Sequence, residues 1–342
     1  MMSELLELPG AVQASWPDEG VAAHYGDPVR EQRALDGAVG LVDRSNRGVL
    51  KITGQDRLSW LHSLTTQHLD GLTAGQSAQA LVLSPTGHVE HHLTLSDDGT
   101  SVWVHVEPGT GPALAAFLNS MKFMLRVEVA EESAGAAVLT VMGPAGADIT
   151  AGLEGVLGRV SPGPVGIIDL IVARELLADV AAELVRRGAV PAGLWAFEAL
   201  RIAARVPRFG LDTDHRTIPH EVGWIETAVH LSKGCYRGQE TVARVHNLGH
   251  PPRRLVFLDL DGSVDRLPAH GSPVELDGAT IGLVGSAARH YELGPIGLGL
   301  VKRTVPVDAT LLADGVAAAQ EVIVPPDAGA NVKVTLRRRQ VI

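Results

Sequence analysis

Apolar positions along the first three quarters of the chain follow both the helical and the strand period. Leucines spaced three to five residues apart predict a helix over 56–69. Residues 79–83 and 89–95 predict two strands joined by a turn at Ser84-Pro85-Thr86-Gly87, where glycine accepts a positive φ. Further helices are expected over 28–35, 113–121, 145–157, 176–187, 194–205 and 240–246, and further strands over 49–52, 102–106, 125–129, 137–142 and 165–173. Antiparallel hairpins interleaved with helices predict an α+β fold rather than a parallel Rossmann sheet.

The spacing of apolar runs and of Gly and Pro changes at Arg253. Short apolar runs separated by Gly and Pro then predict a small β-barrel or sandwich, with strands over 255–260, 274–276, 280–284, 296–301 and 332–336. We therefore expect three domains: an N-terminal α+β region over 1–130, a second α+β domain over 131–252, and a C-terminal β-barrel over 253–342.

Composition excludes several classes of protein. The 342 residues hold one cysteine, so neither an intrachain disulfide nor a cluster held by four thiolates of this chain is available. A net charge of −10 argues against a nucleic-acid-binding face, and no apolar run reaches the roughly 18 residues that span a bilayer. The first ten residues lack the basic start of a secretory signal, so a cytoplasmic location without membrane contact is expected. Neither GxGxxG nor GxxxxGK[ST] occurs, which removes the main support for dinucleotide or P-loop binding.

The most informative segment is Lys233-Gly234-Cys235-Tyr236-Arg237-Gly238-Gln239-Glu240. Its two glycines permit a tight loop, and a helix is expected directly afterwards. A helix N-terminus and the cations Lys233 and Arg237 would each stabilise a thiolate at Cys235. On the residues alone, a reactive thiol and an inert cysteine both stay open.

The same segment, K-G-C-Y-x-G-Q-E, resembles the signature of the folate-binding YgfZ-type family, which is related to the aminomethyltransferase (T-protein) of the glycine cleavage system. Four other stretches are similar to that family: Gly40-Leu41-Val42-Asp43-Arg44-Ser45, the helix region from Gly54 to Gln67 with Trp60, Leu200-Arg201-Ile202 followed by Val206-Pro207, and Ile218-Pro219. The similarity covers roughly residues 35–340.

This resemblance implies two α+β (ferredoxin-like) domains and a C-terminal β-barrel around a central channel that binds tetrahydrofolate or a one-carbon derivative. It implies a role in assembly or repair of iron–sulfur enzymes, including tRNA-modifying enzymes, and hence in oxidative stress. Such enzymes or assembly proteins would be its partners. Cys235 would be the functional thiol with Lys233 beside it. The folate-binding candidates are Tyr236, Arg237, Gly238, Gln239, Glu240, Arg201, His91 and Trp60, although Arg201 fits a structural role at least as well.

The sequence departs from true aminomethyltransferases where these carry acids. Their second hairpin strand holds an Asp-Asp pair, and this chain has His91 and His92 there; their L-R-L-E helix end has Glu where this chain has Ala203. Transfer needs a carboxylate where positive charge builds up. A folate-dependent aminomethyltransferase or demethylase of the glycine cleavage T-protein type is therefore the alternative rather than the leading expectation, glycine-cleavage activity itself is not expected, and enzymatic activity is left open.

Two other hypotheses belong to different classes. His88, Glu90 and His92 would share one strand face, and two histidines with a carboxylate can bind a metal, but a solvated polar face explains them equally well, so no metal site is assigned. A pure interaction module that keeps the fold is the third alternative.

Overall fold

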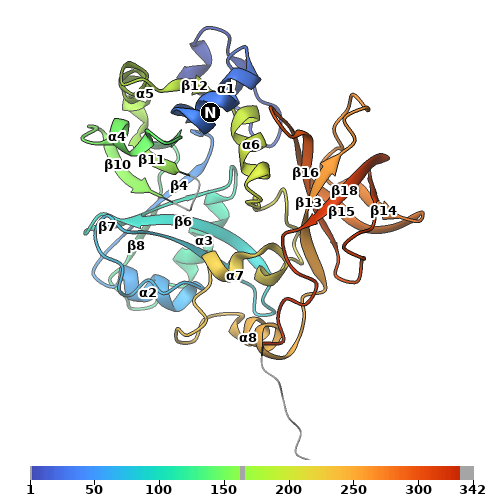
Figure 1. Cartoon of the computed structure of the whole chain (residues 1–342). Coiled ribbons are helices and arrows are strands. Elements are labelled where there is room, and N and C mark those ends of the chain that lie inside the picture. The colour runs from blue at the N-terminus through green and yellow to red at the C-terminus, as the bar shows by residue number, and fades with distance from the viewer. Residues whose placement is uncertain (1, 162–165, 332–342) are drawn as a thin grey trace, which may run out of the picture.

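The computed structural model describes residues 2–161 and 166–331, and Figure 1 shows them arranged as two stacked sheets beside a barrel. The first sheet has the antiparallel order β5-β6-β7-β4-β8. Its strands are β4 (Gly48–Thr53), β5 (Ser77–Leu83), β6 (Val89–Asp97), β7 (Ser101–Val106) and β8 (Glu128–Glu131). The helices α2 (Arg57–Leu64) and α3 (Gly111–Ser120) share a hydrophobic core with this sheet.

The second sheet has the order β10-β11-β9-β3-β12 and packs against the first. Its strands are β3 (Gly40–Asp43), β9 (Ala136–Met142), β10 (Val156–Val160), β11 (Ile167–Ala173) and β12 (Val190–Ala192), with α4 (Gly146–Thr150), η2 (Arg174–Leu176) and α5 (Leu177–Arg186) alongside. The N-terminal segment adds η1 (Glu4–Glu7), the pair β1 (Val12–Gln13) and β2 (Ala22–His24), and α1 (Pro28–Gly37). Because β3 pairs with β9, the N-terminal stretch contributes a strand to the sheet built mainly from residues after 130.

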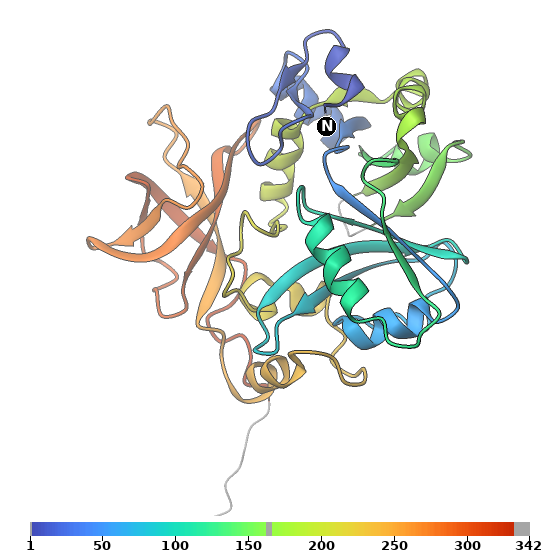
Figure 2. The same cartoon turned by 180° about the vertical axis from the view of Figure 1, so that it is seen from behind.

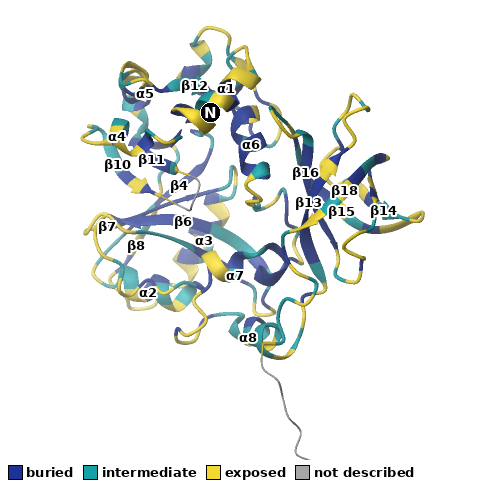
Figure 3. Ribbon diagram, in the orientation of Figure 1, coloured by how far each residue is buried: buried dark blue, intermediate teal, exposed yellow. Residues whose placement is uncertain are grey.

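The barrel is closed in the order β13-β16-β15-β14-β17-β18. Its strands are β13 (Arg253–Leu260), β14 (Pro273–Leu276), β15 (Ala279–His290), β16 (Gly294–Lys302), β17 (Leu311–Ala313) and β18 (Val316–Val322). Closure pairs the edge strands of what would otherwise be an open sheet. The structure thus confirms the predicted α+β architecture with a C-terminal barrel, and Figure 3 shows the strands of both sheets and of the barrel to be largely buried.

The segments that join these parts surround the centre of the molecule. They are α6 (Leu194–Ala203), η3 (Pro219–Val222), α7 (Trp224–Thr227) and α8 (Gln239–Leu248). Helix α6 contacts α1 on one side and the barrel strands β15 and β16 on the other, and Figure 2 shows the same bridging position from behind. A shared core of η3, α7, α8, the β5–β6 hairpin and three barrel strands fixes the barrel to the first sheet.

Several predicted elements differ from the structure in extent or type. The helix expected over 56–69 ends at Leu64. The helix expected over 145–157 ends at Thr150, and β10 follows, because Gly152 and Gly155 adopt positive φ between them. The strand expected over 125–129 lies at Glu128–Glu131, and the strand expected over 332–336 falls outside the described residues. Among the described residues, no helix has the length and apolar character needed to cross a bilayer.

Candidate functional site

A cavity of about 750 Å³ lies where the two sheets, the connecting helices and the end of the barrel segment meet. The first sheet contributes His92, Thr94 and His105, and Glu107 follows directly after β7. The second sheet contributes Asp169. The connecting segments contribute Phe197, Arg201, Arg205, Arg208, His220, Val222, Trp224 and His246. The chain after the barrel closes one side with residues 323–325, Ala328, Gly329 and Asn331. The volume lies in the range of pockets that bury a small organic ligand.

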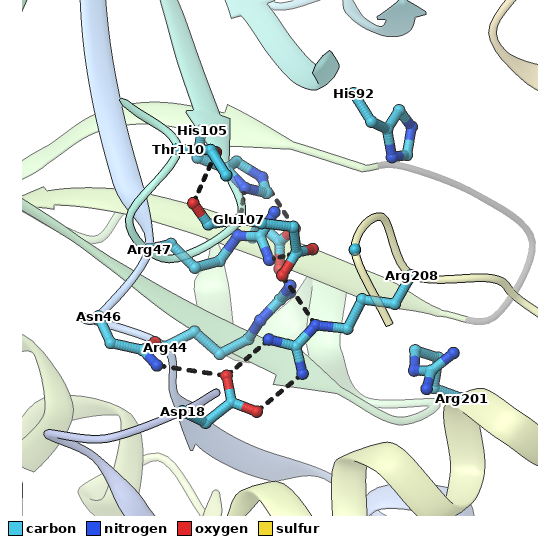
Figure 4. A network of polar contacts seen from close by, with 12 residues as sticks. Asp18, Arg44, Asn46, Arg47, His92, His105, Glu107, Thr110, Arg201 and Arg208 are labelled. Atoms are coloured by element: carbon cyan, nitrogen blue, oxygen red, sulfur yellow. Dashed lines mark hydrogen bonds and ion pairs between the residues drawn. The ribbon is translucent and has the colours of Figure 1, made fainter. Parts of the chain in front are cut away.

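One wall of the cavity is an arginine network (Figure 4). We use that name for Arg44, Arg47, Arg201 and Arg208 together with Asp18, Glu107, Asp169, Glu198 and Asp212. Arg208 is its centre. Its guanidinium binds both oxygens of Asp18 at 2.6 and 2.8 Å, donates to Glu107 Oε2 at 2.8 Å, and lies 3.4 Å from Glu198. Such forked contacts hold a buried cation and its carboxylates in one geometry.

Burial and the neighbouring cations set the charge of Glu107. Burial alone would raise its pKa, but Arg208 and Arg47 hold the pKa of Glu107 well below its usual range. Arg47 Nη1 donates to Glu107 Oε1 at 2.8 Å. Glu107 is therefore an ionised structural partner of two arginines, which is a poor starting point for a general acid or base.

His105 extends the network to the second sheet. Its Nδ1 accepts from Arg47 Nε at 2.8 Å, so its proton lies on Nε2, which is 3.1 Å from Asp169 Oδ2. Burial, reinforced by Arg47, lowers the pKa of His105 to about 4, so the ring is neutral near pH 7. Thr140 and Arg44 donate to the other Asp169 oxygen at 2.6 and 3.2 Å.

The two histidines at the Asp-Asp positions point to opposite sides of β6. His92 lines the cavity, donates from Nε2 to Gln79 Oε1 at 3.0 Å, and stacks on Trp224 with ring centroids 4.6 Å apart. His91, one residue earlier on the strand, is not among the cavity-lining residues described above, and its buried Nδ1 has no hydrogen-bond partner among the residues that the structure describes. Burial lowers the pKa of both rings to about 4.

The loop singled out in the sequence is fixed to the first sheet and its helix. Lys233 Nζ donates to the carbonyl oxygens of His62, Thr65 and Gln67 at the C-terminal end of α2. Helix ends leave these carbonyls without intrahelical partners, so a buried ammonium satisfies them well. Burial lowers the pKa of Lys233 to about 8.

The second half of the loop rests on the β5–β6 hairpin. Arg237 Nη1 donates to Glu90 Oε2 at 3.0 Å, and its guanidinium lies 5.5 Å from the Phe117 ring centroid. Gly238 has φ +82°, and a Cβ there would lie 2.6 Å from the Ser84 carbonyl oxygen, so only glycine fits. The turn and the loop therefore pack directly together.

The remaining candidate site residues of this loop differ in how far they are buried. Cys235 is exposed, and both predicted cationic neighbours, Lys233 and Arg237, are engaged by other groups. Tyr236 is buried, and with Gln239 it lines a second cavity of about 210 Å³, which shares Leu231 and His246 with the central one. Glu240 is exposed on the first turn of α8.

The last two candidates have clear structural partners. Trp60 is buried in the core of the first sheet, where its indole nitrogen donates to the Met121 carbonyl at 3.3 Å. Arg201 lines the central cavity, but its guanidinium binds Glu198, Asp212 and Ser286 at 2.6 to 3.0 Å. Their use in ligand binding stays a prediction.

No cluster of three metal-ligating side chains was found within residues 2–161 and 166–331. The register of β6 against β5 shifts between Val89 and His91, so Glu90 lies at an irregularity that interrupts the alternation on which the predicted shared face of His88, Glu90 and His92 rests. In the structure Glu90 pairs with Arg237, and His92 pairs with Gln79.

Sequence reasoning missed most of the arginine network, because its members are scattered from residue 18 to residue 212. One feature of the sequence does point to this network. His105 lies in the run Val-Trp-Val-His-Val and Asp169 in Ile-Ile-Asp-Leu-Ile, and a titratable residue inside a buried strand needs a polar partner. The buried partners of those two residues are each other.

Known proteins that resemble the chain agree with this architecture. Residues 21–157 match the family model of the GCVT N-terminal domain. Over 294 residues the chain is 29% identical to an aminomethyltransferase of Synechococcus sp. (strain WH7803), with 76% of this chain and 78% of that protein covered. It is 26% identical over 318 residues to a chloroplastic protein of Arabidopsis thaliana that is provisionally named a transferase, with coverage of 84% and 70%.

The fold has a solved counterpart. The crystal structure of the glycine cleavage system aminomethyltransferase T from Bartonella henselae superposes with a TM-score of 0.79 at 19% identity, covering 96% of this chain and 98% of that one. The chain therefore has the three-part fold of that enzyme. Together with the sequence matches, this supports the predicted relationship to the GcvT superfamily; the narrower YgfZ-type assignment stays a prediction.

Proposed function

We propose that the protein binds tetrahydrofolate or a one-carbon derivative in the central cavity and belongs functionally to the folate-dependent proteins of the aminomethyltransferase type. The observation that carries this proposal is the cavity of about 750 Å³ at the junction of the three parts. It is large enough for such a ligand. The relatives that are named aminomethyltransferases support the same ligand class.

The wall chemistry fits a flat heteroaromatic ring with polar edges. Trp224, Phe197 and Val222 supply apolar and aromatic surface, while His92 and His220 place imidazoles among them. Apolar walls with a few fixed polar groups are typical of sites that orient a small ligand. The arginines of the network are engaged by carboxylates, so they stiffen the wall, and Arg205 is the arginine at the exposed rim.

Aminomethyl transfer requires a carboxylate close to the reacting amine, and the carboxylates that line this cavity are poorly suited to that role. The methylene group passes from the carrier's sulfur to two nitrogens of tetrahydrofolate, while ammonia leaves and the carrier thiol is freed. Positive charge and protons at the reacting amine call for a nearby carboxylate. Of the three carboxylates that line the cavity, Glu107 and Asp169 are held by arginines, and Glu226 is exposed on α7. Of the two positions where aminomethyltransferases carry the Asp-Asp pair, the one that faces the cavity is His92.

We therefore expect His92→Asp to raise methylene-tetrahydrofolate formation from an aminomethyl-lipoyl carrier protein by about tenfold or more over a slow wild type. The matched control is His91→Asp, one residue earlier on the same strand and on its other side, which should leave the rate unchanged. Equal rates for both variants, or an increase only in His91→Asp, would show that the cavity face of β6 is not where transfer needs its acid.

A second candidate function is support of iron–sulfur enzymes through Cys235. What favours it is the exposed thiol on a loop that Lys233 anchors to the end of α2 and that Arg237 and Gly238 anchor to the β5–β6 hairpin. None of the relatives reported above carries such a role in its name. Deleting the gene should lower the activity of cluster-containing enzymes, Cys235→Ala should fail to restore it, and Ser232→Ala in the same loop should restore it. Normal cluster-enzyme activity in the deletion strain rejects this role.

A further inference from the structure

His220 is a buried histidine of the central cavity that the chain leaves without a partner. Its exposed fraction is 5%, and it lines the cavity from η3. Neither ring nitrogen has a hydrogen-bond partner among the described residues, and both are closed to solvent. A buried polar group of this kind, left without a partner, destabilises the folded chain.

The position of His220 is enforced by its surroundings. The neighbouring Glu221 is fully buried, accepts from the Ile218 backbone at 3.2 Å, and binds Arg253 at 2.8 and 2.9 Å. Gly223, with φ +78°, ends the segment. The neighbouring contacts thus fix the backbone that carries His220, and the imidazole is buried there although its nitrogens have no partner among the described residues.

The nearest aromatic neighbour of His220 does not satisfy it. The His246 ring on α8 lies with its centroid 6.1 Å away, and no hydrogen bond joins the two rings in the described structure. His246 itself lies beside Asn331, whose side chain donates to its carbonyl oxygen at 2.8 Å. His246 lines both cavities and is half-buried, and we infer that its side chain moves when a ligand reaches the His220 ring.

The charge state of His220 limits what it can recognise. Burial, with a smaller effect from His246, lowers its pKa to about 4. At neutral pH the ring therefore offers one donor and one acceptor and no charge. Such a group suits amide-like and amine groups on an uncharged ring better than a carboxylate.

We propose that His220 is a ligand-contacting residue of the central cavity, and that its two ring nitrogens hydrogen-bond uncharged donor and acceptor groups of the bound ligand, as the pterin ring carries them. This inference rests on the proposed folate function and adds a residue, His220, that recognises the pterin ring by hydrogen bonds. Trp224 and Val222 of the same cavity wall supply the apolar and aromatic surface that a pterin needs beside it.

The test compares His220→Leu, His220→Gln and the exposed control His215→Leu by equilibrium titration with tetrahydrofolate and by thermal unfolding without ligand. His220→Leu should weaken binding by about tenfold or more while the unfolding temperature of the free protein stays equal or rises, because an unsatisfied polar group has been removed. His220→Gln should recover much of the affinity, and His215→Leu should match the wild type. A tetrahydropterin without the glutamyl tail should show the same fold-loss.

Unchanged affinity in His220→Leu would overturn the inference and leave the proposed function standing. So would a loss of affinity that comes with a lower unfolding temperature, since that marks a structural role. A loss confined to the ligand with the glutamyl tail would likewise overturn it. Absence of tetrahydrofolate binding by the wild-type chain would reject the proposed function itself, and this inference with it.

Discussion

Replacing Arg208 by methionine should lower the free energy of unfolding by about 3–5 kcal/mol. Methionine occupies much of the arginine volume, so the loss comes from charge rather than from a cavity. Without Arg208, Asp18 loses its guanidinium partner and keeps, within residues 2–161 and 166–331, only the Asn46 side chain at 3.3 Å. Glu107 and Glu198 keep Arg47 and Arg201. A carboxylate left buried without its cation is far more costly than the pair itself was favourable.

The matched control for this prediction is Arg186→Met. Arg186 also forms a short ion pair, with Glu183, but its side chain is 73% exposed. Exposed pairs contribute about 0–1 kcal/mol, so this variant should unfold like the wild type. Urea denaturation of the three proteins measures the difference. An Arg208→Met variant no less stable than Arg186→Met would mean that the arginine network does not support the cavity wall.

Filling the cavity should abolish ligand binding without unfolding the chain. Thr94 on β6 lines the central cavity and pairs across the sheet with His105. A phenylalanine at residue 94 would extend into the space that the ligand needs, and we expect the dissociation constant for tetrahydrofolate to rise by about a hundredfold or more, which corresponds to roughly 2.7 kcal/mol.

The control for this variant is Thr280→Phe. Thr280 is exposed on β15 of the barrel and does not line the central cavity, so the same substitution there should leave the affinity unchanged. Circular dichroism and thermal unfolding would show that both variants keep the fold. Equal affinity of the two variants would place the ligand outside the central cavity.

The residues of the turns and the spacing of apolar residues made much of the fold predictable from the sequence. The hairpin around Ser84–Gly87 is confirmed, because its turn residues and the alternation of β5 and β6 indicate the same structure. The prediction of a helix over 145–157 is wrong beyond Thr150. The alanines and leucines of this range favour a helix locally, but Val156–Val160 form β10 and pair with β11. The short strands β3 and β12 carry too few residues to show a period.

The site was predictable only where it is local in sequence. The loop from Lys233 to Glu240 could be found from its motif, yet the structure alone shows that Lys233 closes the end of α2. The arginine network and His220 depend on contacts between residues far apart in the chain, such as Arg208 with Asp18. The pair His91 and His92 shows the same limit: the sequence reveals that two acids are missing, and the structure shows which of the two positions faces the cavity.

The central claim is that one reduced folate binds in the central cavity. Calorimetric titration of the purified wild-type chain with tetrahydrofolate, under reducing conditions that protect the ligand, tests it most directly. The structure predicts saturable binding of one molecule per chain, with the heat lost in Thr94→Phe and retained in Thr280→Phe. No saturable binding by the wild type, or undiminished binding by Thr94→Phe, would contradict it.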